Sequence, residues 1–184
     1  MPTLPPDTLR EPLSDQDWPL GPDDAPVAIV EYSDYDCPDC RAAYPIVETL
    51  LAQQAGRVRF AVRHFPLTNV HPRALAAARA AEAAGRQGKF WQMHHILFAQ
   101  PIGPSDEQLH DYARQIDLDM ERFADDFADR QLEREILRRR GQGLRSGVNG
   151  APIFYINGAK YTGEVTLEAL TEAIDAAAQS DDES

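Results

Sequence analysis

Two cysteines separated by two residues are the side chains of this sequence best suited to covalent chemistry. They lie in the segment Cys37-Pro38-Asp39-Cys40, and the 184-residue chain contains no other cysteine. An apolar run precedes the segment and an apolar pattern of helical spacing follows it, so we expect the pair at a helix start. Residues three apart there can close a reversible disulfide. The free N–H groups of a helix start favour a thiolate at Cys37. We expect Cys37 to be the exposed thiol that attacks, and Cys40, one turn deeper, to be the shielded thiol that resolves.

A structural zinc site is the main alternative for such a pair. It needs about four ligands, so two of the five histidines would have to complete it: His64, His71, His94, His95 and His110. No two of these histidines have a recognisable ligand spacing, and no glycine-rich phosphate-binding loop follows a predicted strand. We therefore expect a redox pair that uses no metal and no other cofactor.

The segments around the cysteines predict a strand–helix–strand unit. Residues 27–32 form a mostly apolar β-branched run, residues 37–55 have apolar side chains at helical spacing, and residues 58–63 alternate. The intervening loop contains Asp34 and Asp36, which are candidate N-cap residues. A helix between two strands predicts a parallel pair joined by a crossover.

The rest of the chain divides into a helical block and a late hairpin. Residues 72–146 have no strand signal, and they include an alanine-rich run and a capping box at 105–108. Residues 152–162 predict a hairpin turning at Asn157-Gly158, and a last helix is expected to run from Thr166 to Ala178.

The two ends of the chain predict less regular structure. Residues 1–25 are rich in proline and predict an extended arm, for which Trp18 and Leu20 are candidate anchors. Residues 179–184 are expected to form an acidic tail.

The charge of the chain disfavours several classes of protein. With 30 acidic and 18 basic residues the net charge is −12, which argues against nucleic-acid binding and against docking onto anionic membranes. No apolar stretch approaches the ~18 residues of a membrane helix. Residues 1–17 lack the features of a secretory signal, so the expected location is the cytoplasm.

The sequence resembles the DsbA-like thiol-disulfide oxidoreductases of the thioredoxin superfamily over residues 26–178. Glu31 stands six residues before Cys37, where the family has a buried acid, and Pro45 stands where the active-site helix kinks. Gly150-Ala151-Pro152 matches the cis-proline loop. Residues 63–67 and 87–91, which read Arg63-His64-Phe65-Pro66-Leu67 and Gln87-Gly88-Lys89-Phe90-Trp91, resemble stretches of bacterial members.

This resemblance implies an α/β fold, namely a thioredoxin-like fold of order βαβ … ββα with an inserted α-helical domain. The thioredoxin-like domain would comprise residues 26–66 and 147–178, and the helical insertion residues 67–146. The resemblance also implies the catalytic residues Cys37, Cys40, Glu31 and Pro152, and the substrate-binding residues Pro38, Asp39 and Ala151.

Two of these residues have roles that follow from their surroundings. Glu31, if buried, would have a raised pKa and could exchange a proton with Cys40. Pro152, if cis, would leave the backbone of Ala151 to pair with an extended substrate strand.

The expected function is reduction, oxidation or isomerisation of protein disulfides. Its partners would be protein or peptide thiols and disulfides and an unidentified redox partner, and we expect a monomer. The acidic Asp39 stands where strongly oxidising members have histidine, and negative charge there disfavours the thiolate and predicts a more reducing couple. Two alternatives remain: a redox-switched chaperone or partner-binding module, and a glutathione-dependent transferase or isomerase of the same superfamily.

Overall fold

A four-stranded mixed sheet with the strand order β2-β1-β3-β4 forms the centre of the computed structural model, which describes residues 7–182. Strands β1 (Val27–Ser33) and β2 (Val58–His64) run parallel. Strand β3 (Ile153–Ile156) is antiparallel to β1, and β4 (Ala159–Lys160) is antiparallel to β3. Helix α1 (Pro38–Gln53) provides the crossover that parallel strands require. The predicted strand–helix–strand unit and the late hairpin are therefore confirmed.

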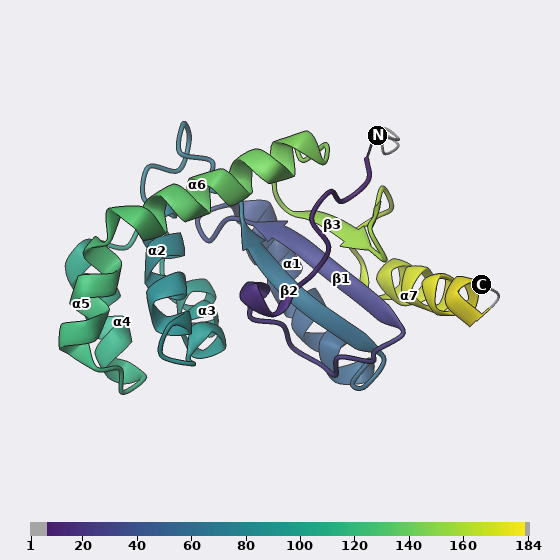
Figure 1. The fold of residues 1–184 in the computed structure, drawn as a ribbon, viewed down its shortest axis with the longest axis horizontal. Coiled ribbons are helices and arrows are strands. Elements are labelled where there is room, and N and C mark those ends of the chain that lie inside the picture. The colour runs from purple at the N-terminus through teal and green to yellow at the C-terminus, as the bar shows by residue number, and fades with distance from the viewer. Residues whose placement is uncertain (1–6, 183–184) are drawn as a thin grey trace.

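Helices α1 and α7 (Leu167–Asp182) cover one face of the sheet, and Figure 1 shows α1 behind the strands. Alternate side chains of β1 and β2 point to this face, as the period of a strand requires. The core here joins residues of both strands and both helices: Val27, Ile29, Val58, Phe60, Val62, Val47, Leu50, Leu170 and Ile174. Helix α7 continues to Asp182, beyond the predicted end at Ala178.

Five helices form a block beside one end of the sheet (Figure 1). They are α2 (Ala74–Gly85), α3 (Phe90–Ala99), α4 (Asp106–Gln115), α5 (Met120–Ala128) and α6 (Arg130–Arg145). The predicted capping box is present at the start of α4, where Ser105 Oγ accepts a hydrogen bond from the N–H of Gln108. Helix α2 begins at Ala74, two residues after Pro72, and the N–H of Ala74 donates to the carbonyl of His71 in the turn before the helix. Helix α6 leaves the block and packs against β2.

The N-terminal arm, defined here as residues 7–20, lies across the other face of the sheet (Figure 1). Leu9 packs there with buried side chains of both halves of the chain: Val30, Tyr32, Phe65, Val148 and Tyr155. Leu20 pairs with Phe60 of β2, and the indole N–H of Trp18 donates to Glu82 at 2.8 Å. Both predicted anchors therefore hold the arm.

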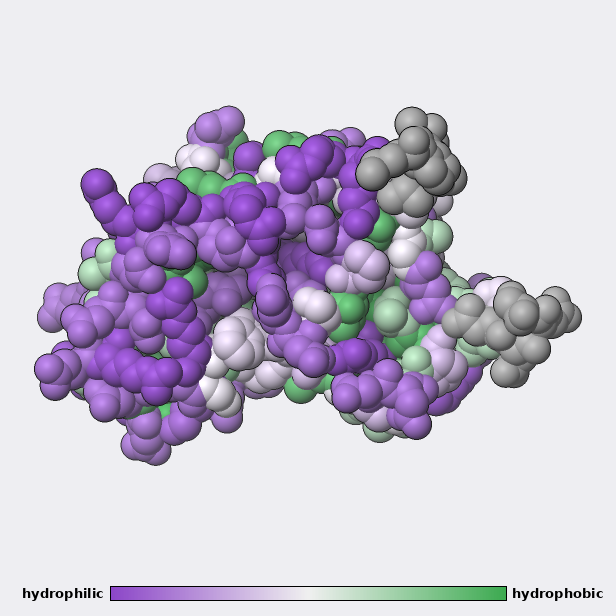
Figure 2. Space-filling model, in the orientation of Figure 1, coloured by the Kyte–Doolittle hydropathy of each residue, from purple (hydrophilic) through white to green (hydrophobic). Residues whose placement is uncertain are grey.

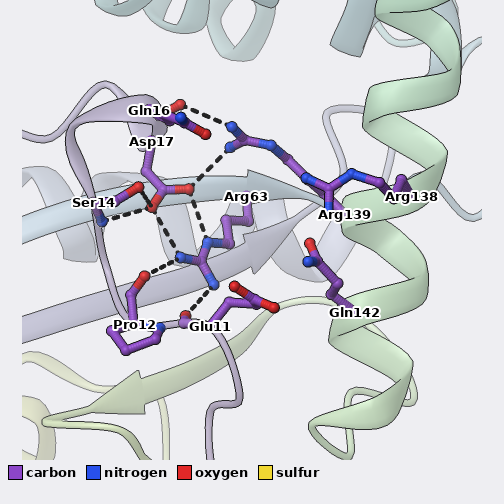
Figure 3. A pocket seen from close by; sticks show the side chains of 9 residues that line it. All are labelled: Glu11, Pro12, Ser14, Gln16, Asp17, Arg63, Arg138, Arg139 and Gln142. Carbon is purple, nitrogen blue, oxygen red and sulfur yellow. Dashed lines mark hydrogen bonds and ion pairs between the residues drawn. The ribbon is translucent and has the colours of Figure 1, made fainter.

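A buried ion-pair network fixes the arm and α6 to β2 (Figure 3). Asp17 accepts hydrogen bonds from Arg63 at 2.9 and 2.8 Å and from Arg139 at 3.0 Å. Burial raises the pKa of Asp17, but the hydrogen bonds and charges of the two arginines outweigh it and hold the pKa below its ordinary value. A polar cavity of about 200 Å³ adjoins the network, and Figure 2 shows that hydrophilic side chains dominate this face of the molecule.

Candidate active site

Cys37 is the N-cap residue of α1, directly before Pro38. Pro38 suits the first helical position because its missing N–H would have no partner there. Cys37 is only 5% exposed, and its Sγ lies 3.4 Å from the carbonyl oxygen of Ala151. The expectation of an exposed attacking thiol is therefore corrected: the loop containing Ala151 covers Cys37, although Cys40, at 0% exposure, is the deeper of the two.

Cys40 lies in the core beneath Cys37, and both cysteines are free thiols. Its Sγ accepts a hydrogen bond from the backbone N–H of Asp34 at 3.4 Å. Burial raises the pKa of Cys40 well above its ordinary value, and the charge of Glu31 raises it further. At neutral pH Cys40 is a protonated thiol, which needs a base before it can attack.

Glu31 is the buried acid of the site. It lies in β1 between Val62 of β2 and Phe154 of β3, and it is 5% exposed. Loss of hydration raises its pKa from 4.5 to about 7. The predicted burial is confirmed. A carboxyl group with this pKa can both accept and release a proton near neutrality.

The loop before β3 contains a cis peptide bond between Ala151 and Pro152, as the resemblance implied. Pro152 lines a cavity of about 280 Å³, together with Asp39, Ala42, Ala43, Ile46 and Val165. The cavity therefore extends from the cis-proline loop along the first two turns of α1. Pro38 and Asp39 are exposed at the start of this helix, next to Cys37.

Asp34 and Asp36 do not cap α1, so this expectation was wrong. Their side chains are buried and hold loops of the helical block instead. Asp34 accepts a hydrogen bond from the N–H of Leu67 at 2.9 Å, and Asp36 accepts one from the N–H of Gly103 at 2.9 Å. Asp commonly accepts the N–H two residues on in an Asx turn, and this tendency is a local sequence signal against capping. Asp34 accepts the N–H of Asp36 in this way.

Arg41 is another residue of the site, and its role could not be assigned from the sequence. Its guanidinium donates to the carbonyl of Tyr35 and to the carbonyls at the end of α3, those of Leu97, Phe98 and Gln100, at 2.8–3.0 Å. Because these carbonyls have no partner within their helix, a cation is stabilising there. Arg41 therefore fastens the active-site helix to the helical block.

The histidines considered as zinc ligands have other contacts. His64 lies 3.2 Å from Glu82, His71 lies 2.9 Å from Asp34, and Tyr35 Oη lies 3.0 Å from His94 Nδ1. Within residues 7–182 no three His, Cys, Asp or Glu side chains group as a metal site. No helix of this part of the chain is long and apolar enough to cross a membrane.

Comparison with known proteins identifies related sequences. A family model described as Thioredoxin matches residues 14–176. The Na(+)/H(+) antiporter NhaA 3 of Salinispora tropica is 43% identical over 160 residues, which are 87% of this chain and 24% of that protein. The Na(+)/H(+) antiporter NhaA 1 of Salinispora arenicola is 44% identical over 165 residues, 89% of this chain and 25% of that protein. The chain thus spans about a quarter of the length of these curated relatives.

Solved structures share the fold over most of their length. A thioredoxin-like oxidoreductase from Silicibacter pomeroyi is 30% identical, with a TM-score of 0.77 over 88% of this chain and 91% of that one. The thiol-disulfide exchange protein alpha-DsbA2 from Wolbachia pipientis is 25% identical, with a TM-score of 0.75 over 88% and 90%. BdbD from Bacillus subtilis is 20% identical and shows the same fold, with a TM-score of 0.80 over 95% and 100%.

Proposed function

The chain belongs to the thioredoxin family as a DsbA-like member, and from this premise we propose that it exchanges the thiols and disulfides of other proteins through Cys37 and Cys40. One observation carries the proposal. Two free thiols at the start of α1 lie between the cis-proline loop, which contacts Cys37, and the buried Glu31, whose charge acts on Cys40. This arrangement supplies a nucleophile, a resolving thiol and a base.

In the reducing direction the reaction has two exchange steps. The Cys37 thiolate attacks one sulfur of a substrate disulfide, and the other sulfur leaves as a thiolate. Cys40 then gives its proton to Glu31 and attacks Cys37 Sγ. The Cys37–Cys40 disulfide forms, the mixed disulfide breaks, and the second substrate sulfur leaves as a thiolate that takes up a proton. The reverse sequence oxidises a dithiol.

The pKa of Glu31 fits the second step. Burial raises it to about 7, so a large fraction of the group is ionised and able to take a proton at neutral pH. Cys40, whose pKa burial raises, supplies that proton only at the moment of attack. We assign Glu31 the role of proton acceptor for Cys40.

The substrate would lie along the cis-proline loop. The carbonyl oxygen of Ala151 is within 3.4 Å of Cys37 Sγ, so a strand that pairs with Ala151 brings its cysteine to the nucleophile. The cavity lined by Pro152, Asp39 and Ile46 can receive a neighbouring apolar side chain. Exposed Pro38 and Asp39 complete this contact surface.

We further propose a reductase or isomerase role, supported by the negative charge of Asp39 between the cysteines. The compartment that suits this role is the cytoplasm, where thiols are kept reduced. Alkylation of thiols in intact cells tests whether the protein acts as a reductant, because it shows the redox state of Cys37 and Cys40. A pair found mainly as dithiol at steady state supports it, and a pair found mainly as disulfide contradicts it.

Reduction of insulin by dithiothreitol tests the exchange activity itself. We expect the wild-type protein to accelerate the reduction, and Cys37→Ser to abolish the acceleration. Cys40→Ala should accumulate a mixed disulfide at Cys37, and mass spectrometry of the adducts formed in cells would identify the substrates. The variant without thiols, Cys37→Ser/Cys40→Ser, controls for effects of binding alone. Full activity of Cys37→Ser would refute the mechanism.

One observation also supports a redox-switched binding module. The two loops held by Asp34 and Asp36 each expose a large apolar side chain, Val70 at 68% and Ile102 at 59%. A change at the cysteines could therefore alter an apolar surface of the helical block. Binding of an unfolded client that differs between the dithiol and disulfide forms, in a protein with no insulin reductase activity, would favour this function.

A further inference from the structure

Asp34 contacts both reactive residues through its backbone. Its N–H donates to Cys40 Sγ at 3.4 Å, and its carbonyl oxygen accepts the N–H of Cys37 at 3.1 Å. The orientation of this one residue therefore determines both the start of α1 and the hydrogen bond to the resolving sulfur.

The side chain of Asp34 is clamped in place by three donors. Oδ2 lies 2.9 Å from the N–H of Leu67 and 2.9 Å from His71 Nδ1, and Oδ1 accepts the N–H of Asp36 at 2.8 Å. The side chain is 0% exposed, whereas that of His71 is 18% exposed. A buried carboxylate whose two oxygens contact three donors is fixed in direction, because turning away from them would leave its buried oxygens unpaired. The clamp links the loop before Cys37 to the loop after β2.

The side-chain contacts of Asp34 hold its backbone N–H toward Cys40 Sγ, the atom on which negative charge develops. In the resolving step Cys40 becomes negative before it attacks Cys37, and an N–H directed at the sulfur stabilises that charge. Burial and the charge of Glu31 raise the pKa of Cys40, and the hydrogen bond from Asp34 acts in the opposite direction. This hydrogen bond is therefore one of the interactions that favour the attacking thiolate form of Cys40.

We propose that Asp34, held by His71 and by the Leu67 backbone, is a positioning residue that speeds the attack of Cys40 on the mixed disulfide. This inference rests on the proposed function and adds a residue to its second step. Asp34 touches no substrate; it acts by holding its own N–H against the Cys40 sulfur. The helical block thereby takes part in the chemistry of the thioredoxin-like sheet.

The test separates the two exchange steps. Attack by Cys37 is timed in a Cys40→Ala background, where a peptide disulfide forms a stable adduct. Resolution is timed in proteins that retain Cys40, as the lifetime of the adduct after acid quench and mass spectrometry. We expect Asp34→Ala to lengthen that lifetime about tenfold, the effect of losing one hydrogen bond to a charged group, and to change the rate of Cys37 attack less than about twofold.

Asp36→Ala is the matched control. Asp36 is also buried, lies in the same loop and holds a loop of the helical block, but its backbone does not bond the Cys40 sulfur. We expect its adduct lifetime to stay within about twofold of the wild-type value. His71→Leu, which removes one member of the clamp from outside the loop, should lengthen the lifetime in the same direction as Asp34→Ala. If Asp34→Ala does not fold, the adduct lifetime of His71→Leu still tests the proposal.

The outcomes distinguish this inference from the proposed function. An adduct at Cys37 in the Cys40→Ala protein, and its release when Cys40 is present, establish the exchange activity independently of Asp34. If these hold but Asp34→Ala and His71→Leu leave the lifetime unchanged, slow both steps equally, or match Asp36→Ala, the positioning role is overturned. If the Cys40→Ala protein forms no adduct at Cys37, the proposed function itself fails.

Discussion

The raised pKa of Glu31 makes the stability of the dithiol protein depend on pH. The carboxyl group has a pKa of about 7 in the folded protein because it is buried, against 4.5 for the ordinary group. A group whose pKa rises on folding contributes stability in its protonated form. That contribution is complete below pH 4.5, is lost as the pH rises through about 7, and does not change further above that.

The magnitude follows from the size of the shift. One pKa unit corresponds to about 1.4 kcal/mol, so the full loss is on the order of 3 kcal/mol. Between pH 5 and pH 8 the titration of Glu31 in the folded and unfolded states accounts for a loss of about 2–3 kcal/mol. Replacing Glu31 with glutamine keeps the shape of the side chain and removes the titration. The variant should therefore gain this amount relative to the wild type as the pH is raised.

Urea unfolding at pH 5 and pH 8 measures the effect, with the thiols kept reduced by a phosphine. The quantity to compare is the difference in unfolding free energy between Glu31→Gln and the wild type at each pH, because contributions common to both proteins cancel. Glu168→Gln, at an exposed position of α7, controls for the loss of one negative charge. A difference that is the same at both pH values to within about 0.5 kcal/mol would show that burial does not shift the titration of Glu31.

Four further substitutions test other parts of the structure. Gly143→Ala would place a Cβ 2.7 Å from the ring of Tyr32 and should cost about 1–3 kcal/mol in urea unfolding. On the same helix a Cβ at Gly141 would make only an ordinary contact, 3.8 Å from the Arg145 guanidinium, so Gly141→Ala should stabilise by about 0.5–1 kcal/mol. Asp17→Ala leaves the buried Arg63 and the partly buried Arg139 without their carboxylate, and we expect a loss of about 3–5 kcal/mol in the same assay. Asp39→His exchanges a negative side chain for one that can be positive beside the thiolate. It should raise the reduction potential by about 30 mV, measured by equilibration with glutathione redox buffers.

Short, strongly patterned segments were predictable from the sequence. The apolar run at 27–32 and the helical spacing after Cys37 depend only on residues close in the chain, and they gave β1 and α1 to within about two residues. The resemblance supplied what local patterns do not contain, namely the burial of Glu31 and the cis bond before Pro152. The predicted redox pair stands at the predicted helix start.

Contacts between distant segments were not predictable. Asp34 meets His71 across 37 residues, and Asp36 meets Gly103 across 67, so one sequence gives no sign that these carboxylates are buried. Arg63 has the alternation of a solvent-facing strand residue, yet the arm covers that face and leaves it 6% exposed. Packing likewise outweighs helix propensity where α6 passes through Gly143, because the missing side chain lets the helix approach a core tyrosine.

The arm has a consequence for how the protein can meet other chains. It pairs with β2 through Leu20 and with β4 through Thr8, so one segment occupies both outer strands of the sheet. Unpaired outer strands are templates onto which a foreign strand can add and from which aggregates grow. An oxidoreductase that handles extended, incompletely folded polypeptides is especially exposed to that hazard. The arm engages the outer strands of this sheet at Phe60 and Ala159, so under the proposed function the backbone beside Cys37 is left for such a polypeptide to pair with.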